Sequence, residues 1–236
     1  MWSGPRTLST ALMRSFENRS DTVVVDEPLY GYYLAETGID HPGRDEILAS
    51  MPTGWPEVVD ELTSGPLPAG RIVYYQKHMT HHLLPEIPRG WMRELHNCFL
   101  IRDPGQMLTS LLKHVPDATI EDTGYPQQVE IFNLVREWKG EVPAVLDSRD
   151  VLDNPQRLLA LLCDRLGVGF TEKMLSWPPG LRETDGVWAK YWYKEVQTTT
   201  TFRPFSAKDE KVPAEFEALA RECDRFYRQL YSHRMT

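Results

Sequence analysis

The stretch Ser3-Gly4-Pro5-Arg6-Thr7-Leu8-Ser9-Thr10-Ala11-Leu12, near the start of a chain of 236 residues, has the composition of an anion-binding loop that leads into a helix. Gly4 and Pro5 favour a tight turn, and the Ser9-Thr10 pair opens the helix. The free N–H groups and the dipole of a helix N-terminus attract anions, and the Arg6 guanidinium can offer paired donors to phosphate or sulfate oxygens. The stretch is not a Walker motif, because it lacks Gly-Lys-Ser/Thr. Taken alone, it fits an ordinary capped helix start equally well.

Four short apolar runs indicate buried strands, because each is rich in Val, Ile, Tyr or Phe and ends at a polar residue. They are Thr22–Asp26, Arg71–Gln76, Cys98–Arg102 and Val142–Asp147. Helices are expected between and after them, over Ser9–Glu17, Gln106–His114, Gln127–Glu137, Pro155–Leu166 and Pro213–His233. This alternation predicts an α/β fold, a P-loop-like three-layer sandwich with a central, mainly parallel sheet flanked by helices. Only Met1-Trp2 precede the loop, so its strand is either a stub or missing from this chain.

The composition is that of a globular protein, with 41% apolar and 25% charged residues, and the length fits one domain over residues 1–236. The formal net charge of −8 argues against a nucleic-acid partner. No apolar run is long enough to cross a membrane, and the N-terminus does not have the pattern of a secretory signal. The three cysteines form no Cys-x-x-Cys pair. We therefore expect reduced thiols and a cytoplasmic location.

A second pair of anion-binding candidates follows the third apolar run. Arg102 ends that run, and Ser110 lies eight residues later, about two turns into the next helix. An arginine suits a dianionic phosphate, and a serine hydroxyl can complete its hydrogen bonding. The alternative is that Arg102 pairs with Asp103 and that Ser110 faces solvent.

These two constellations resemble those of the sulfotransferases that use 3'-phosphoadenosine 5'-phosphosulfate. Pro5-Arg6-Thr7-Leu8-Ser9-Thr10 is similar to the family's Pro-Lys-Ser-Gly-Thr-Thr loop, with Arg6 at the lysine position and Leu8 at the glycine position. The resemblance implies that Arg6, Thr7, Leu8, Ser9 and Thr10 hold the 5'-phosphosulfate. In the same family an arginine at a strand end and a serine eight residues later bind the 3'-phosphate, as Arg102 and Ser110 are spaced here.

The resemblance also implies an activity. It is the transfer of a sulfuryl group to a hydroxyl or amine of a small-molecule or glycan acceptor, by a cytosolic or membrane-associated enzyme that needs no metal. Such transfer requires cations near the bridging oxygen of the donor. Arg6 and Lys77 are the candidates, because Lys77 follows the apolar run Val73–Gln76 and matches the lysine that many sulfotransferases carry there.

The catalytic base has several candidates. Glu27 follows the first apolar run, and several sulfotransferases of glycans use a glutamate at a comparable strand end. His82 is an equal candidate and His81 a weaker one, because imidazole suits proton transfer near neutral pH. Cytosolic sulfotransferases have a Lys-x-His pair at this point, whereas this chain has Met79. A metal site at the adjacent histidines is ranked low, because the side chains of neighbouring residues diverge.

Two other functions remain open. One is an ATP-using P-loop-type kinase or transferase, against which the absent Walker lysine counts. The other is a non-catalytic nucleotide-binding relative, which Leu8 and the missing or short first strand keep open. By position alone, Tyr30–Leu67 and Pro116–Gln128 are expected to frame the acceptor cleft. Neither the acceptor nor the oligomeric state is predicted.

Overall fold

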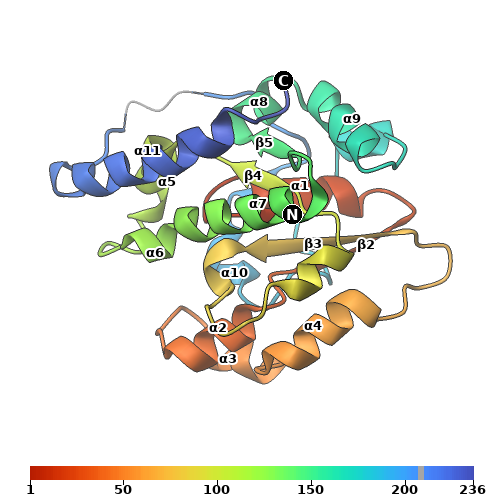
Figure 1. The fold of residues 1–236 in the computed structure, drawn as a ribbon, viewed down its shortest axis with the longest axis horizontal. Coiled ribbons are helices and arrows are strands. Elements are labelled where there is room, and N and C mark those ends of the chain that lie inside the picture. The colour runs from red at the N-terminus through yellow and green to blue at the C-terminus, as the bar shows by residue number, and fades with distance from the viewer. Residues whose placement is uncertain (207–209) are drawn as a thin grey trace.

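The computed structural model describes residues 1–206 and 210–236, and its centre is one parallel sheet of five strands (Figure 1). The strands are β1 (Trp2–Ser3), β2 (Thr22–Asp26), β3 (Val73–Met79), β4 (Phe99–Ile101) and β5 (Val145–Asp147). Their spatial order is β2-β3-β1-β4-β5, and every neighbouring pair is parallel. The predicted α/β class with a central parallel sheet is confirmed.

Helices connect and flank the strands. The α-helices are α1 (Ser9–Glu17), α2 (Tyr30–Thr37), α3 (Arg44–Ser50), α4 (Trp55–Ser64), α5 (Pro104–Leu111), α6 (Ile120–Thr123), α7 (Tyr125–Lys139), α8 (Ser148–Asp153), α9 (Pro155–Arg165), α10 (Ala189–Trp192) and α11 (Glu217–Tyr231). Short 3-10 turns lie at Thr80–His82, Gly90–Glu94, Glu172–Leu175, Val196–Thr198 and Ala214–Phe216. The ranges of α1 and β2 match the prediction. In contrast, β3 continues to Met79, so Lys77 lies inside that strand rather than after it. In the described part of the chain, no helix is long and apolar enough to span a bilayer.

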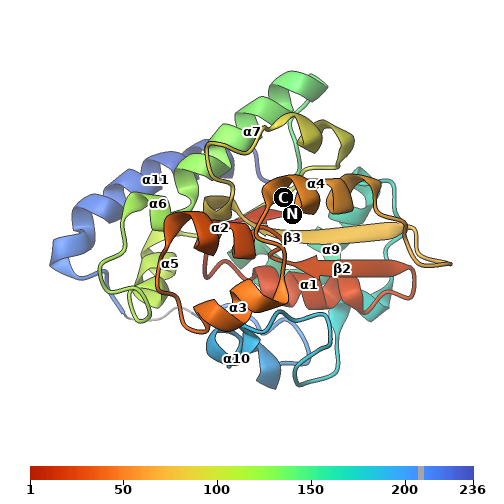
Figure 2. The same ribbon diagram turned by 90° about the horizontal axis from the view of Figure 1, so that it is seen from below.

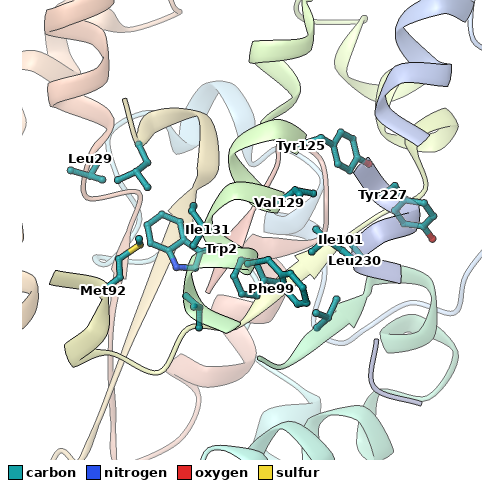
Figure 3. Close-up of a cluster of buried hydrophobic side chains, with 14 of the residues drawn as sticks. Trp2, Leu29, Met92, Phe99, Ile101, Tyr125, Val129, Ile131, Tyr227 and Leu230 are labelled. Atoms are coloured by element: carbon teal, nitrogen blue, oxygen red, sulfur yellow. The ribbon is translucent and has the colours of Figure 1, made fainter. Parts of the chain in front are cut away.

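Two apolar layers cover the two faces of the sheet. In Figure 2, α4 and α7 lie on one side of the strands and α1 on the other. Side chains alternate accordingly: Phe99 and Ile101 point into the layer with α7 and α11, and Leu100 points into the layer with α1 and α9. Figure 3 shows the first layer, where Trp2 and Phe99 lie beside Val129 and Ile131 of α7. The core therefore holds the strand ends in place from both sides.

The first strand is a stub of two residues at the centre of the sheet. Trp2 is in register with His78 of β3 and with Phe99 of β4. Its N–H donates to the Cys98 carbonyl at 2.8 Å, and its fully buried ring stacks on His78 at 4.3 Å between centroids. A short strand is sufficient here because its neighbours are paired on both sides. The loop that begins at Gly4 therefore directly follows the central strand of the sheet.

Gly4 gives the first testable prediction. A Cβ at this position would lie 2.6 Å from the carbonyl oxygen of Thr123, which is backbone and cannot move aside cheaply. We expect Gly4→Ala to lower the free energy of unfolding by about 1–3 kcal/mol, measured by urea denaturation. The control is Gly90→Ala, where a Cβ meets no atom within 4 Å. Equal stability of the two variants would show that the loop does not pack against Thr123.

Candidate functional site

A cavity of about 680 Å³ lies at the carboxyl ends of the strands, where ligands bind in parallel α/β sheets. The segment after β1, the ends of β2 to β4, the start of α8 and the late segment from Trp192 to Ser206 contribute to its walls. All of the site residues predicted from the sequence line it. They are Arg6, Thr7, Leu8, Ser9, Thr10, Glu27, Lys77, His81, His82, Arg102 and Ser110. The structure therefore brings together residues that are more than a hundred positions apart in the chain.

The loop before α1 is held in an unusual backbone conformation. Arg6 has φ 58° and Leu8 has φ 77°, both in the left-handed region that favours glycine. This explains why the resembling loops carry a glycine where this chain has Leu8. The Thr7 hydroxyl donates to the Gly4 carbonyl at 2.8 Å, so it stabilises the turn from within. The first helical bond of α1 runs from the Leu12 N–H to the Leu8 carbonyl, which leaves the N–H groups of residues 9–11 without helical partners.

Two arginines lie side by side next to these free N–H groups. Arg6 Nε donates to Ser110 Oγ at 2.9 Å, and Arg102 Nη1 donates to the Arg6 carbonyl at 2.6 Å. Burial, together with the nearby positive charge of Arg6, lowers the pKa of Arg102. Within the described residues neither guanidinium forms an ion pair, and Asp103 instead accepts from the Gln106 N–H at 3.0 Å as the cap of α5. Two cations without an ion-pair partner beside a helix N-terminus have the chemistry of a candidate anion site.

Ser148 is a part of this site that the sequence analysis did not single out as a site residue. Its Oγ lies 2.6 Å from the Thr7 carbonyl and 2.8 Å from the Ile101 carbonyl. The hydroxyl therefore joins the anion-binding loop to β4 and to the start of α8. The sequence signal was its position directly after the fourth apolar run, at the carboxyl edge of the sheet.

Lys77 is buried and all three of its ammonium donors are used. Its Nζ lies 2.8 Å from Asp26 Oδ1, 2.5 Å from Glu27 Oε1 and 2.9 Å from the Tyr193 hydroxyl. An ammonium has three donors, so none is left for a ligand in this arrangement. The register of the sheet places Lys77 directly beside Asp26, at the end of β2. Lys77, predicted as a cation near the donor, lines the cavity, and its ammonium is bonded to two carboxylates and a tyrosine hydroxyl.

Glu27 is the carboxylate of this cluster that lines the cavity, and it is more exposed than Asp26. Burial raises the pKa of Glu27, and the charge of Lys77 offsets this only in part. Although burial alone would favour the neutral amine of Lys77, the charges of Asp26 and Glu27 outweigh it and raise the pKa of Lys77 well above its usual value. Glu27 also has φ 46°, a strained backbone conformation for a residue other than glycine. A carboxylate with a raised pKa is a better proton acceptor near neutral pH.

The two predicted histidines occupy an aromatic wall. The His82 ring is stacked between Tyr30, at 4.6 Å, and Tyr33, at 4.7 Å between ring centroids. Its Nδ1 is buried without a hydrogen-bond partner among the described residues and lies 4.0 Å from Glu27 Oε2. Burial lowers the pKa of His82 well below its usual value and that of His81 to about 4. Both imidazoles are therefore uncharged at neutral pH.

Tyr193 is a buried aromatic residue that the sequence analysis did not single out, and its hydroxyl has a polar role. Its hydroxyl donates to Asp26 Oδ2 at 2.6 Å and accepts from Lys77. Tyr193 directly follows α10 and lies 116 positions after Lys77. No local pattern marks it, because the hydroxyl gains its partners only when the late segment packs against the ends of β2 and β3.

Within the described residues, no three metal-binding side chains are grouped as an ion would require.

The Lys77 cluster gives the second prediction. Lys77→Met removes the ammonium and leaves the buried Asp26 carboxylate without its cation. We expect a loss of about 3–5 kcal/mol in the free energy of unfolding, measured by urea denaturation. The control is Lys190→Met, because Lys190 forms an exposed ion pair with Glu46 and its removal leaves stability unchanged. Wild-type stability of Lys77→Met would show that the ammonium does not hold the two carboxylates.

Comparisons with known proteins place this arrangement in a family. A family model described as a sulfotransferase domain matches residues 1–232. Two proteins of Arabidopsis thaliana, named branched-chain-amino-acid aminotransferase-like protein 1 and protein 2, are 40% identical over 202 residues and 34% identical over 233 residues. These matches cover 85% and 98% of this chain but only 36% and 41% of the relatives, so the chain spans about two fifths of their length.

Two solved structures are also similar at 14% sequence identity. They are the sulfotransferase domain from the Synechococcus PCC 7002 olefin synthase, with a TM-score of 0.48, and the sulfotransferase domain from the curacin biosynthetic pathway, with a TM-score of 0.44. The matches cover 94% and 98% of this chain and 92% and 95% of the respective structures. The family assignment itself rests on the family model, which matches nearly the whole sequence. By that match, this chain belongs to the sulfotransferase domain family.

Proposed function

We propose that residues 1–236 form a single sulfotransferase domain that transfers a sulfuryl group from 3'-phosphoadenosine 5'-phosphosulfate to a hydroxyl or amine of a small acceptor. The observation that carries this proposal is the pair of guanidinium groups, Arg6 and Arg102, which lie together at the N-terminus of α1 without a carboxylate partner in residues 1–206 or 210–236. Two unpaired cations repel one another, and an anion bound between them relieves that repulsion. The proton acceptor Glu27 opens onto the same cavity.

The residues of the cavity fit a nucleotide that carries two separate anionic groups. The free N–H groups of α1, with Arg6, Ser9 and Thr10, would hold the 5'-phosphosulfate, and Arg102 with Ser110 would hold the 3'-phosphate. The bound nucleotide supplies the activated sulfuryl group. Arg6 would stabilise the negative charge that develops on the leaving phosphate. Lys77 is less suited to this role, because its ammonium is already hydrogen-bonded to three protein groups. Arg203 also lines this cavity, from the late segment.

Glu27 is the base that the geometry favours. Its Oε2 and the Nδ1 of His82 are 4.0 Å apart, too far for a direct hydrogen bond but close enough for both to contact one hydroxyl between them. Burial raises the pKa of Glu27 and lowers that of His82, so burial makes the carboxylate a stronger base than usual and the imidazole a weaker one. Glu27 would accept the proton of the acceptor, and His82 would orient the hydroxyl. His81 packs edge-on against the rings of Tyr33 and His82 rather than against Glu27, and it is the weaker candidate.

The names of the two Arabidopsis relatives suggest amino-group transfer as another function. That chemistry with a pyridoxal cofactor uses a lysine whose amine is free to form an imine. Lys77 is the one lysine among the described residues that line the cavity, and it is buried, charged and bonded to three partners. This arrangement favours the sulfotransferase proposal over amino-group transfer.

Calorimetric titration tests the nucleotide assignment. We expect adenosine 3',5'-bisphosphate to bind and ADP and ATP to bind more weakly. Arg102→Ala should weaken binding of the bisphosphate by about 1.5–3 kcal/mol, as expected for loss of a charge-assisted contact. The control is Arg157→Ala, which removes an exposed arginine of α9 outside the cavity. Preference for ATP would support a kinase-type function, and absence of nucleotide binding would contradict the proposal.

Replacement of Glu27 tests the base. Glu27→Gln keeps the shape of the side chain but cannot accept the proton, so we expect transfer to fall at least about a hundredfold while affinity for the bisphosphate is kept. His82→Gln should reduce transfer less, because it alters orientation and not basicity. The measurement is formation of the bisphosphate product with an acceptor found by screening. Full activity of Glu27→Gln together with an inactive His82→Gln would assign the base to His82.

A further inference from the structure

The acceptor side of the cavity is an aromatic chamber, which we define as Tyr30, Tyr33, His41, His81 and His82. All five line the cavity, and their rings contact one another. The Tyr30 hydroxyl is 2.9 Å from His41 Nδ1, and the His41 ring in turn meets the edge of Trp192 at 6.1 Å. Such walls offer π faces and ring edges to a ligand. The Nδ1 atoms of His81 and His82 are buried behind them without a hydrogen-bond partner among the described residues.

The charge of this chamber is negative. Glu27 lies at one side, beside His82, and Asp122 lines the cavity from α6. The Asp122 carboxylate accepts from the Thr119 N–H at 2.8 Å and from the Thr119 hydroxyl at 2.9 Å, both through Oδ2. Tyr33 lines the same cavity as Asp122. Burial raises the pKa of Tyr33 to about 12, with a smaller contribution from the negative charge of Asp122.

No positive charge is free in the chamber to balance these carboxylates. Burial keeps the three imidazoles uncharged, with a lowered pKa for His41, His81 and His82. Among the described residues at this end of the cavity, the cation is Lys77, and its donors are committed to Asp26, Glu27 and Tyr193. The arginines Arg6 and Arg102 contact each other and Ser110 at the anion-binding loop. An anionic acceptor would therefore find no partner near Glu27.

From this geometry we propose that the chamber binds an acceptor that carries an organic cation, an ammonium or quaternary ammonium group, beside its hydroxyl. Aromatic faces next to a carboxylate are the combination that recognises such cations. The cationic group lies against Tyr33 beside Asp122, and the hydroxyl points towards Glu27 and His82. This inference rests on the proposed function for the identity of the acceptor side. The chamber and its charge can nevertheless be tested by binding alone.

Three probes that share a phenol ring and differ in charge test the proposal. They are tyramine, which is cationic, tyrosol, which is neutral, and para-hydroxyphenylacetate, which is anionic. Affinities for the whole protein are measured by ligand-observed NMR or calorimetry at neutral pH. We expect tyramine to bind about tenfold more tightly than tyrosol and the anion to bind most weakly. Equal affinities, tightest binding of the anion, or no binding of any probe would overturn the proposal.

A matched pair of variants locates the effect. Asp122→Asn removes the charge but keeps an oxygen that can accept from Thr119, so α6 keeps its cap. We expect the tenfold preference for tyramine over tyrosol to shrink to about twofold. The control is Glu121→Gln, which removes the same charge from an exposed neighbour outside the cavity and should keep the preference. Equal effects of the two variants would overturn the assignment of Asp122.

A parallel titration with adenosine 3',5'-bisphosphate separates this proposal from the proposed function. Binding of the bisphosphate without discrimination among the three probes would leave the nucleotide site intact and overturn the cationic acceptor. Discrimination that depends on Asp122, without any bisphosphate binding, would support the chamber and overturn the sulfotransferase assignment.

Discussion

The ammonium of Lys77 is the contact on which the rest of the site depends. It joins the end of β2 through Asp26, the strained residue Glu27, and the late segment through Tyr193. One positive charge faces two carboxylates, so the cluster carries an excess of negative charge in a buried place. Burial and this excess both favour a proton on Glu27, the more accessible of the two acids. The interaction that holds the fold together at this edge therefore also sets the basicity of Glu27.

The residues with a strained backbone conformation lie at the same cavity. Among the described residues, those other than glycine with a positive φ are Arg6, Leu8 and Glu27, and all three line it. Each costs on the order of 1–3 kcal/mol and persists only where surrounding contacts fix it. The loop is fixed by Ser148, which contacts the Thr7 carbonyl, and Glu27 is fixed by Lys77. Left-handed φ turns the loop so that the N-terminus of α1 opens onto the cavity.

Much of this arrangement could be predicted from the sequence, because it depends on local patterns. Parallel strands end at one edge, so polar residues after each apolar run were expected to meet, and Arg6, Arg102 and Ser110 do meet there. The role of Lys77 could not be predicted. It depends on the register that places Lys77 beside Asp26 and on a tyrosine hydroxyl from the distant late segment, and neither leaves a trace in the sequence around Lys77.

The division of charge within the cavity has a consequence for how two ligands share it. The proposed nucleotide is strongly anionic and would be attracted to Arg6 and Arg102, which have no acidic partner among the described residues. An acceptor of the same sign would compete for those arginines and would be repelled by Glu27 and Asp122. A cationic acceptor has the opposite preference, so each ligand is drawn to its own end of the cavity. The Lys77 cluster makes this possible, because Asp26 and Glu27 together outweigh the charge of Lys77, whereas a lysine without these partners would attract anions to the acceptor side.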